Sequence, residues 1–161
     1  MDPRTHRDIM QVVLCLVMLV TVGCAEQRSD VERNLVNEVK KGPGTVVNMA
    51  AVATFEWDYL YVFLPYTQPQ EVRRTLGFWW AHPIVYQLDE SDGFTLLVFV
   101  RGRQVAGYVL FPANIGWFDP PAKIGKDLRE GYRRENAAFR VAEMKDSAGN
   151  RWGYLLKVIR K

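Results

Sequence analysis

Segment 57–64, with the sequence WDYLYVFL, restricts the fold more than any other part of the chain. Aromatic and branched side chains fill it, and both types favour β-strands. Alternate residues of a strand point to opposite faces. This gives one set of Trp57, Tyr59, Tyr61 and Phe63 and a second set of Leu60, Val62 and Leu64. Because both sets are apolar, the strand has to be covered on both sides. We therefore expect it to be the central strand of the fold.

Two β-hairpins are predicted after this strand. The first runs over residues 94–111 with Gly102 at its tip, and the second over residues 137–160 with Gly149 at its turn. The connector between them, residues 112–136, is long for a loop without structure, so we expect it to be functional or locally helical. Its basic residues are interleaved with acidic ones, which favours a solvated helical face over residues 123–134.

Two short helices are predicted. Residues 29–42 place Val31, Leu35 and Val39 on one face, and a capping-box pattern begins the segment. Residues 67–77 begin with a second capping box, formed by Thr67 and Gln70, and end at a glycine. The aromatic-rich segment that follows is interpreted as a connection with a short strand at 84–88.

These elements predict a single α+β domain over residues 29–161. We expect an antiparallel sheet of about five strands, including the two C-terminal hairpins, packed by two short helices. The chain is 48% hydrophobic and 24% charged, as is typical of a globular protein. Its formal charge of +3 is small, and no concentrated basic stripe points to nucleic acid as a partner.

The first 23 residues have the layout of a secretory signal: two arginines, an apolar run of about 14 residues and a small-residue exit. The exit ends in Gly23-Cys24, which resembles a bacterial lipobox. Residues 1–23 are therefore interpreted as a lipoprotein signal peptide, residues 24–28 as a tether, and acylated Cys24 as the attachment to the lipid bilayer. Cleavage after Ala25, giving a soluble periplasmic or secreted protein, and an uncleaved anchor remain alternatives. By resemblance to known sorting rules, Ala25 after the cysteine favours the outer membrane.

Catalytic and metal-binding patterns are weak in the rest of the chain. His82 is the one histidine outside the signal segment, and zinc sites need three or four suitable ligands. The DESDG turn at 89–93 lacks the ligand spacing of a calcium loop. No serine lies in a nucleophile-elbow pattern. We therefore expect no metal and no cofactor.

Glu56 and Asp58 are the remaining catalytic candidates. On a strand they would point the same way, about 7 Å apart, which is within the range of a two-carboxylate hydrolase. A structural role is the alternative, in which Asp58 accepts hydrogen bonds from backbone donors where the strand begins. The absence of a matching base or nucleophile favours the structural role.

The aromatic content points to binding. The chain has five Trp, seven Tyr and eight Phe, and Trp and Tyr outside a core are over-represented at binding surfaces. The loops GFWWAHP and NIGWFDPP are the candidate binding segments, through Trp79, Trp80, Trp117 and Phe118. The alternative is that these rings cover a thin sheet.

Segment 55–67 also carries a resemblance. Its pattern Phe-x-Trp-Asp-x-x-Tyr-x-Phe-x-Pro-Tyr-Thr resembles that of small bacterial exported proteins and lipoproteins of uncharacterised function. The structural motif comprises Trp57, Asp58, Tyr61, Pro65 and Tyr66. The resemblance covers roughly residues 45–158. It implies a shared fold and export, and it carries no activity.

The function predicted from these features is a membrane-tethered periplasmic binding module without enzymatic activity. Its partner is expected to be a protein or another envelope component, and one version is an immunity-type inhibitor of an envelope-acting toxin. Two alternatives remain open: a small envelope-polymer hydrolase that uses Glu56 and Asp58, and a structural envelope lipoprotein.

Overall fold

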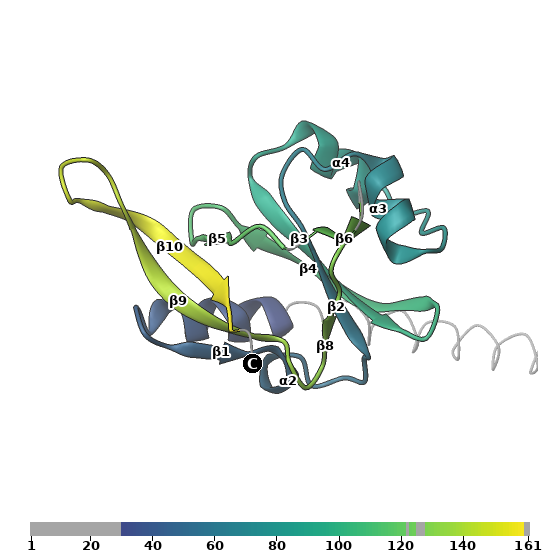
Figure 1. Ribbon diagram of the computed structural model, residues 1–161, viewed down its shortest axis with the longest axis horizontal. Helices are drawn as coiled ribbons and strands as arrows, with labels where there is room; N and C mark the ends of the chain where they lie inside the picture. The colour runs from purple at the N-terminus through teal and green to yellow at the C-terminus, as the bar shows by residue number, and fades with distance from the viewer. Residues whose placement is uncertain (1–29, 122, 125–127, 160–161) are drawn as a thin grey trace, which may run out of the picture.

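The computed structural model describes residues 30–121, 123–124 and 128–159 (Figure 1). An N-terminal helix covers residues 30–40. The later helices are α2 (Met49–Val52), α3 (Pro69–Leu76) and α4 (Ile84–Glu90). The strands are β1 (Val46–Asn48), β2 (Tyr59–Phe63), β3 (Phe94–Arg101), β4 (Gln104–Pro112), β5 (Trp117–Phe118), β6 (Lys123–Ile124), β7 (Leu128–Arg129), β8 (Tyr132–Arg133), β9 (Ala138–Lys145) and β10 (Arg151–Val158).

The predicted single α+β domain is confirmed, and its strands form two sheets where one was expected. The first four-stranded sheet has the order β1-β9-β10-β5, and the second has the order β4-β3-β2-β8. Strands β6 and β7 pair only with each other. The predicted hairpins are β3–β4 in the second sheet and β9–β10 in the first. Gly102 (φ 59°) and Gly149 (φ 85°) lie at their turns, in the backbone region that favours glycine.

The connector between the hairpins contributes one edge strand to each sheet. It supplies β5 to the first sheet, where β5 runs parallel to β10, and β8 to the second sheet, where β8 runs antiparallel to β2. The prediction of a helical face over 123–134 is therefore wrong for the described residues, since they form short strands. Arg129, on β7, lies 3.0 Å from the Glu71 carboxylate of α3.

Strand β2 lies at the centre of the second sheet and is covered on both faces, as predicted. On one face, Leu60 and Val62 join a core with the N-terminal helix and the inner side of the first sheet. On the other face, Phe63 packs in a separate core with α3, α4 and β3. Trp57 belongs to the first core with Leu60 and not to the face of Tyr61 and Phe63. The alternation expected from sequence fails there because the strand begins only at Tyr59.

The N-terminal helix is confirmed, and its apolar face is the one predicted. Val31, Leu35 and Val39 are at most 1% exposed, and they pack in the first core. The expected capping residue, Ser29, lies outside the described residues.

The prediction for the start of α3 is wrong, although its end at Gly77 is confirmed. Gln68 is the N-cap residue and makes no side-chain capping bond, while Pro69 occupies the first turn. The Thr67 hydroxyl donates to the Leu64 carbonyl at 2.6 Å, and Thr67 lies one residue before the N-cap position. Gly77 closes the helix with φ 73°.

Segment 84–88 is helical in α4, and the predicted strand is wrong. Ile84, Val85 and Leu88 are buried, and Tyr86 and Gln87 are exposed. That spacing matches one face of a helix and not the period of two of a strand. Figure 1 shows α3 and α4 side by side at one end of the molecule, with the β9–β10 hairpin extending away at the other.

Candidate functional site

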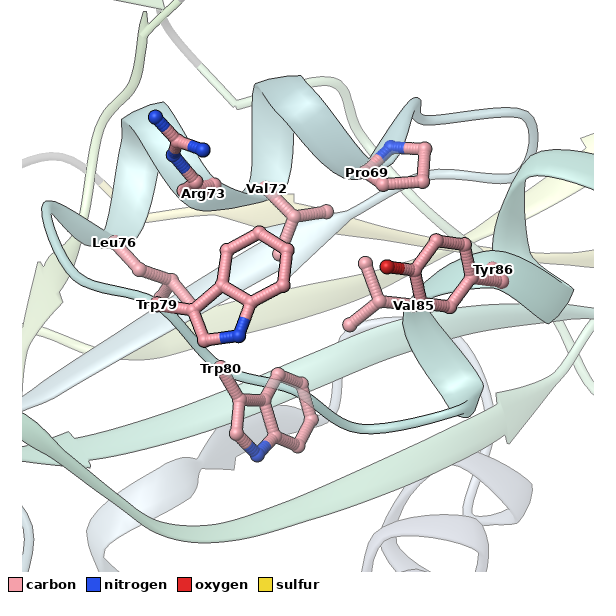
Figure 2. A pocket seen from close by; sticks show the side chains of 8 residues that line it. All are labelled: Pro69, Val72, Arg73, Leu76, Trp79, Trp80, Val85 and Tyr86. Atoms are coloured by element: carbon pink, nitrogen blue, oxygen red, sulfur yellow. The ribbon is translucent and has the colours of Figure 1, made fainter.

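Exposed aromatic side chains gather on the α3–α4 part of the molecule. Five large hydrophobic residues of the described chain are exposed, and three of them belong to this part: Tyr66, Trp79 and Tyr86. Trp79 and Tyr86 border a groove between the two helices (Figure 2). We call its rim, formed by Pro69, Arg73, Trp79, Trp80 and Tyr86, the aromatic surface.

The two helices hold the aromatic surface by burying their opposite faces. Val72 and Leu76 of α3 and Val85 of α4 are buried, and they form the apolar floor of the groove. Gly77 ends α3 in the left-handed conformation, so the chain turns back and brings Trp79 alongside the helix. In Figure 2, Val72 and Val85 lie between the rings of Trp79 and Tyr86.

The groove is shallow. It encloses about 10 Å³, roughly the volume that one water molecule needs. Small-molecule sites are much larger, about 300–1,000 Å³. The arrangement therefore fits contact with the surface of another macromolecule better than enclosure of a metabolite.

Two contacts orient the tryptophans of this surface. The Arg73 guanidinium lies 5.6 Å from the centre of the Trp79 ring, within the range of a cation–π interaction. Trp80 is half-buried, because it stacks on His82 with ring centres 5.2 Å apart and meets the edge of Tyr108 at 5.5 Å. Trp79, which is 61% exposed, is thus the accessible member of the predicted pair.

His82 packs beneath the aromatic surface and fixes the start of α4. Its Nδ1 accepts a hydrogen bond from the Ile84 amide at 3.2 Å. Its Nε2 lies 3.3 Å from the Tyr108 hydroxyl. Because Nδ1 accepts, a neutral imidazole carries its proton on Nε2, which can donate to Tyr108. Both ring nitrogens of His82 therefore make contacts that support the local structure.

The second predicted loop is not part of the aromatic surface. Phe118 is 2% exposed and meets Phe111 and Phe139 edge-to-face in the first core, so its prediction as a binding residue is wrong. Trp117 is half-buried on β5, opposite Leu155 of β10. The two tryptophan loops lie on different sheets: α3 and α4 pack on the second sheet, whereas β5 belongs to the first. Phe118 was misassigned because a two-residue strand gives no pattern that separates its inner from its outer side chain.

The two carboxylates of the central segment have separate contacts. The Asp58 Oδ2 accepts a hydrogen bond from the Gly102 amide at 2.7 Å, which ties the start of β2 to the β3–β4 turn. Glu56 is exposed and lies 3.4 Å from the Arg134 guanidinium. Glu56 lines an open depression of about 350 Å³ beside Arg101 and Gln104, and Asp58 is not part of that lining. The structural role predicted for Asp58 matches its contact with Gly102.

The remaining residues of the 55–67 motif divide between core and surface. Trp57 is 2% exposed, and Tyr61 is half-buried against Gly131, where a Cβ would come within 2.7 Å of the Tyr61 ring. Burial raises the pKa of the Tyr61 hydroxyl, and the neighbouring Tyr59 raises it further. Pro65 and Tyr66 form the turn before α3.

Tyr66 is the unexpected member of the motif. It has φ 62°, a left-handed conformation that is costly for any residue with a Cβ, and its side chain is 61% exposed. Its amide donates to the Leu88 carbonyl of α4 at 2.9 Å. Sequence reasoning also missed Tyr86 and Trp152 as exposed aromatics. Recognising α4 as a helix would have identified Tyr86, because position 86 faces away from Ile84, Val85 and Leu88.

The structure leaves the predictions for the N-terminus untested. Residues 1–29, including Cys24 and the tether, lie outside the described residues. Within the described part of the chain, no helix has the length and apolar character of a membrane span. The same residues contain no group of three or more side chains placed to hold a metal ion.

Comparisons of the chain with models of protein families, with curated proteins and with solved structures found no match. The resemblance of segment 55–67 to small bacterial exported proteins and lipoproteins therefore stays a prediction.

Proposed function

We propose that this protein is a binding module of the bacterial envelope, tethered to a membrane through acylated Cys24 and without enzymatic activity. Its partner is a protein that docks on the aromatic surface. In the version we favour, the module is an immunity-type inhibitor of an envelope-acting toxin. The tether follows from the sequence of the signal segment.

One observation carries the proposed docking site: Trp79 and Tyr86 are 61% and 55% exposed on either side of an apolar groove. Two large aromatic rings left in water forgo burial worth roughly 2 kcal/mol each. Trp, Tyr and Arg are also the residue types that dominate binding energy at protein interfaces, and Arg73 completes this set. The shallow groove supports a protein partner because a protein side chain can rest in it without being enclosed.

The test measures binding of the full-length protein to the partner that it retains from detergent-solubilised envelope. We expect Trp79→Ala and Tyr86→Ala each to weaken binding by about 2 kcal/mol or more, roughly thirtyfold. Gln87→Ala is the matched control, because Gln87 is exposed on α4 beside Tyr86 and lies outside the groove lining. Unchanged affinity in both aromatic variants would refute the docking site, and binding to purified envelope polysaccharide alone would exclude a protein partner.

The tether has its own test. Cys24→Ala is expected to move the protein from the membrane fraction to the soluble fraction, because acyl chains supply roughly 0.8 kcal/mol per buried methylene. Mass spectrometry of the mature N-terminus is expected to show a lipidated cysteine as its first residue. An unmodified N-terminus beyond Ala25 would instead establish a soluble exported protein.

A further inference from the structure

The end of the β9–β10 hairpin projects as a two-stranded arm. Near its base, β9 pairs with β1 through residues 138–140, and β10 pairs with β5 through Leu155 and Leu156. Between Glu143 and Tyr154, the described strands pair only with each other. We call residues 143–154 the arm. Figure 1 shows it extending beyond the rest of the molecule. An isolated two-stranded ribbon is marginally stable in water, and within the arm Tyr154, at its base, packs against the first core.

The tip of the arm is nevertheless well ordered by its own hydrogen bonds. The Asp146 carboxylate accepts from the Ala148 amide at 2.9 Å, from the Asn150 amide at 2.8 Å and from the Asn150 side chain at 3.2 Å. Gly149 supplies the positive φ of 85° that the turn requires. A loop held in one conformation loses less entropy when it binds. The tip is therefore preorganised for contact.

A β-bulge beside the tip directs Trp152 outward. Arg151 pairs with Lys145 and Gly153 pairs with Met144, so Trp152 has no cross-strand partner in the register of the hairpin. Its side chain is 58% exposed. Bulges commonly re-aim a side chain at functional positions. This bulge leaves the largest side-chain type in water at the projecting end of the molecule.

Arg151 and Tyr154 are fixed beside Trp152. The Arg151 guanidinium donates to the Tyr154 hydroxyl at 2.7 Å and lies 5.0 Å from the centre of its ring. Arg, Trp and Tyr therefore occur within four consecutive residues, and they are the three types enriched in interface hot spots. We call Arg151, Trp152 and Tyr154 the arm triad.

The charge of the hairpin indicates the kind of surface that it fits. The arm itself is charge-balanced, with Lys145 and Arg151 against Glu143 and Asp146. The excess of basic side chains lies at the base of the hairpin, at Arg140 and Lys157. Both acidic groups have contacts within the hairpin: Asp146 in the turn and Glu143 at 3.0 Å from Lys145. Arg140 and Lys157 face each other across the strands and are both exposed. Like charges directly opposite each other are unfavourable, and a nearby acidic partner surface relieves their repulsion.

We propose that the arm inserts Trp152, with Arg151 beside it, into a cleft of the partner protein whose rim is acidic. The inference rests on the proposed binding function and adds a second contact that the aromatic surface does not supply. A convex, preorganised loop complements a concave site, as the long loops of some antibody domains do. Arg140 and Lys157, at the base of the hairpin, meet the acidic rim, while Trp152 fills the apolar part of the cleft.

The experiment uses the full-length protein and the partner retained from envelope extract, purified and then recombined. Calorimetry is expected to show that Trp152→Ala weakens binding at least thirtyfold. Ser147→Ala is the matched control in the turn, because the Ser147 side chain is exposed outside the triad. Circular dichroism and melting curves check that the variants stay folded. Raising the ionic strength from about 0.05 M to 0.5 M is expected to slow association several-fold, because basic and acidic surfaces steer each other.

The outcomes separate the two proposals. If Trp152→Ala binds with wild-type affinity while Trp79→Ala weakens the same complex, the proposed insertion of the arm is refuted. Docking on the aromatic surface is then still supported. The opposite pattern would support the arm and refute docking on α3 and α4. Association that does not depend on salt would exclude the acidic rim. A wild-type dimer that Trp152→Ala converts to a monomer would mean that the arm binds a second copy of this chain. If no protein is retained, both proposals fall.

Discussion

Removal of the Asp58 carboxylate is the most direct test of its structural role. In the folded protein its Oδ2 accepts a hydrogen bond from the Gly102 amide at 2.7 Å, although the two residues are 44 positions apart in the chain. Two backbone bonds flank this contact: the Asp58 amide donates to the Val100 carbonyl, and the Arg134 amide donates to the Asp58 carbonyl. The carboxylate therefore joins the start of β2 to the turn between β3 and β4.

The expected loss of stability follows from the charge of the acceptor and from the exposure of this hydrogen bond to water. A hydrogen bond to a charged group contributes about 1.5–3 kcal/mol, but Asp58 and Gly102 are both exposed, so water replaces part of what is lost. We expect Asp58→Ala to lower the free energy of unfolding by about 1 kcal/mol. Asp58→Asn keeps an acceptor oxygen and is expected to lose about half as much.

Urea unfolding gives the stability change, and hydrogen exchange of the Gly102 amide gives a local readout. For a chain of this length, 1 kcal/mol corresponds to a shift in Tm of about 2–4 °C. Glu56→Gln is the control, because its exposed contact with Arg134 at 3.4 Å is worth less than about 1 kcal/mol. If Asp58→Ala leaves both the stability and the Gly102 exchange rate at wild-type values, the structural role is wrong. Loss of an enzymatic activity with unchanged stability would revive the hydrolase alternative.

Three further predictions concern single positions. Gly116→Ala is expected to destabilise the fold by about 1–3 kcal/mol in urea unfolding, because a Cβ would lie 2.6 Å from the backbone oxygen of Tyr154; stability within 0.3 kcal/mol of wild type would contradict this contact. Tyr66→Gly is expected to raise the free energy of unfolding by up to about 1 kcal/mol, since glycine adopts φ 62° without strain; a loss of stability would mean that the tyrosine ring contributes packing. Hydrogen bonds that Asn150 donates to the Asp146 carboxylate, first from its backbone amide and then from its side chain, lower the pKa of Asp146. The stabilisation of the turn is then complete above the ordinary pKa of an aspartate and is lost as the pH falls through the lower folded-state value. An NMR titration of the Asp146 carboxyl is expected to show a midpoint below the ordinary aspartate range, and a midpoint within that range would refute the hydrogen-bonded turn.

The elements with strong periodicity were predictable from the sequence. The N-terminal helix shows three buried residues at intervals of four, and both hairpins show alternating strands around a glycine turn. Strand β2 was identified as central because both of its faces are apolar, and each face meets a different core. Local pattern and tertiary packing agree in all of these elements.

The failures occur where local patterns are short or ambiguous. Segment 84–88 is rich in branched and aromatic residues, which favour a strand, but burial of Ile84, Val85 and Leu88 against β3 selects the helix. The connector contains two-residue strands that form only because neighbouring strands supply their hydrogen bonds. Division into two sheets depends on other long-range pairings, of β1 with β9 and of β2 with β3, so no window of the sequence contains that information.

The candidate site was predictable only in part, because the exposure of a side chain also depends on tertiary packing. Composition indicated that some tryptophans would be exposed, and Trp79 is one of them, but exposure depends on which side of each element meets a core. Phe118 and Trp117 are neighbours in sequence and have opposite environments for this reason. The exposed ring of Trp152 depends on a register shift in the hairpin, which leaves no sequence signal beyond Gly153 beside it.

Tyr66 and Trp152, two of the four exposed aromatics of the described chain, share a feature that packing does not explain. Tyr66 holds a left-handed backbone conformation, and Trp152 occupies a bulge that interrupts a hairpin. A left-handed conformation costs a residue with a Cβ roughly 1–2 kcal/mol, and a bulge gives up ladder hydrogen bonds. Neither side chain recovers this cost in a core, since both are more than half exposed. Local rules are broken in folded proteins mainly where function requires it. Backbone departures and exposed aromatic rings thus coincide at Tyr66, beside α4, and at Trp152, on the β9–β10 hairpin, as the proposed contacts with a partner would require.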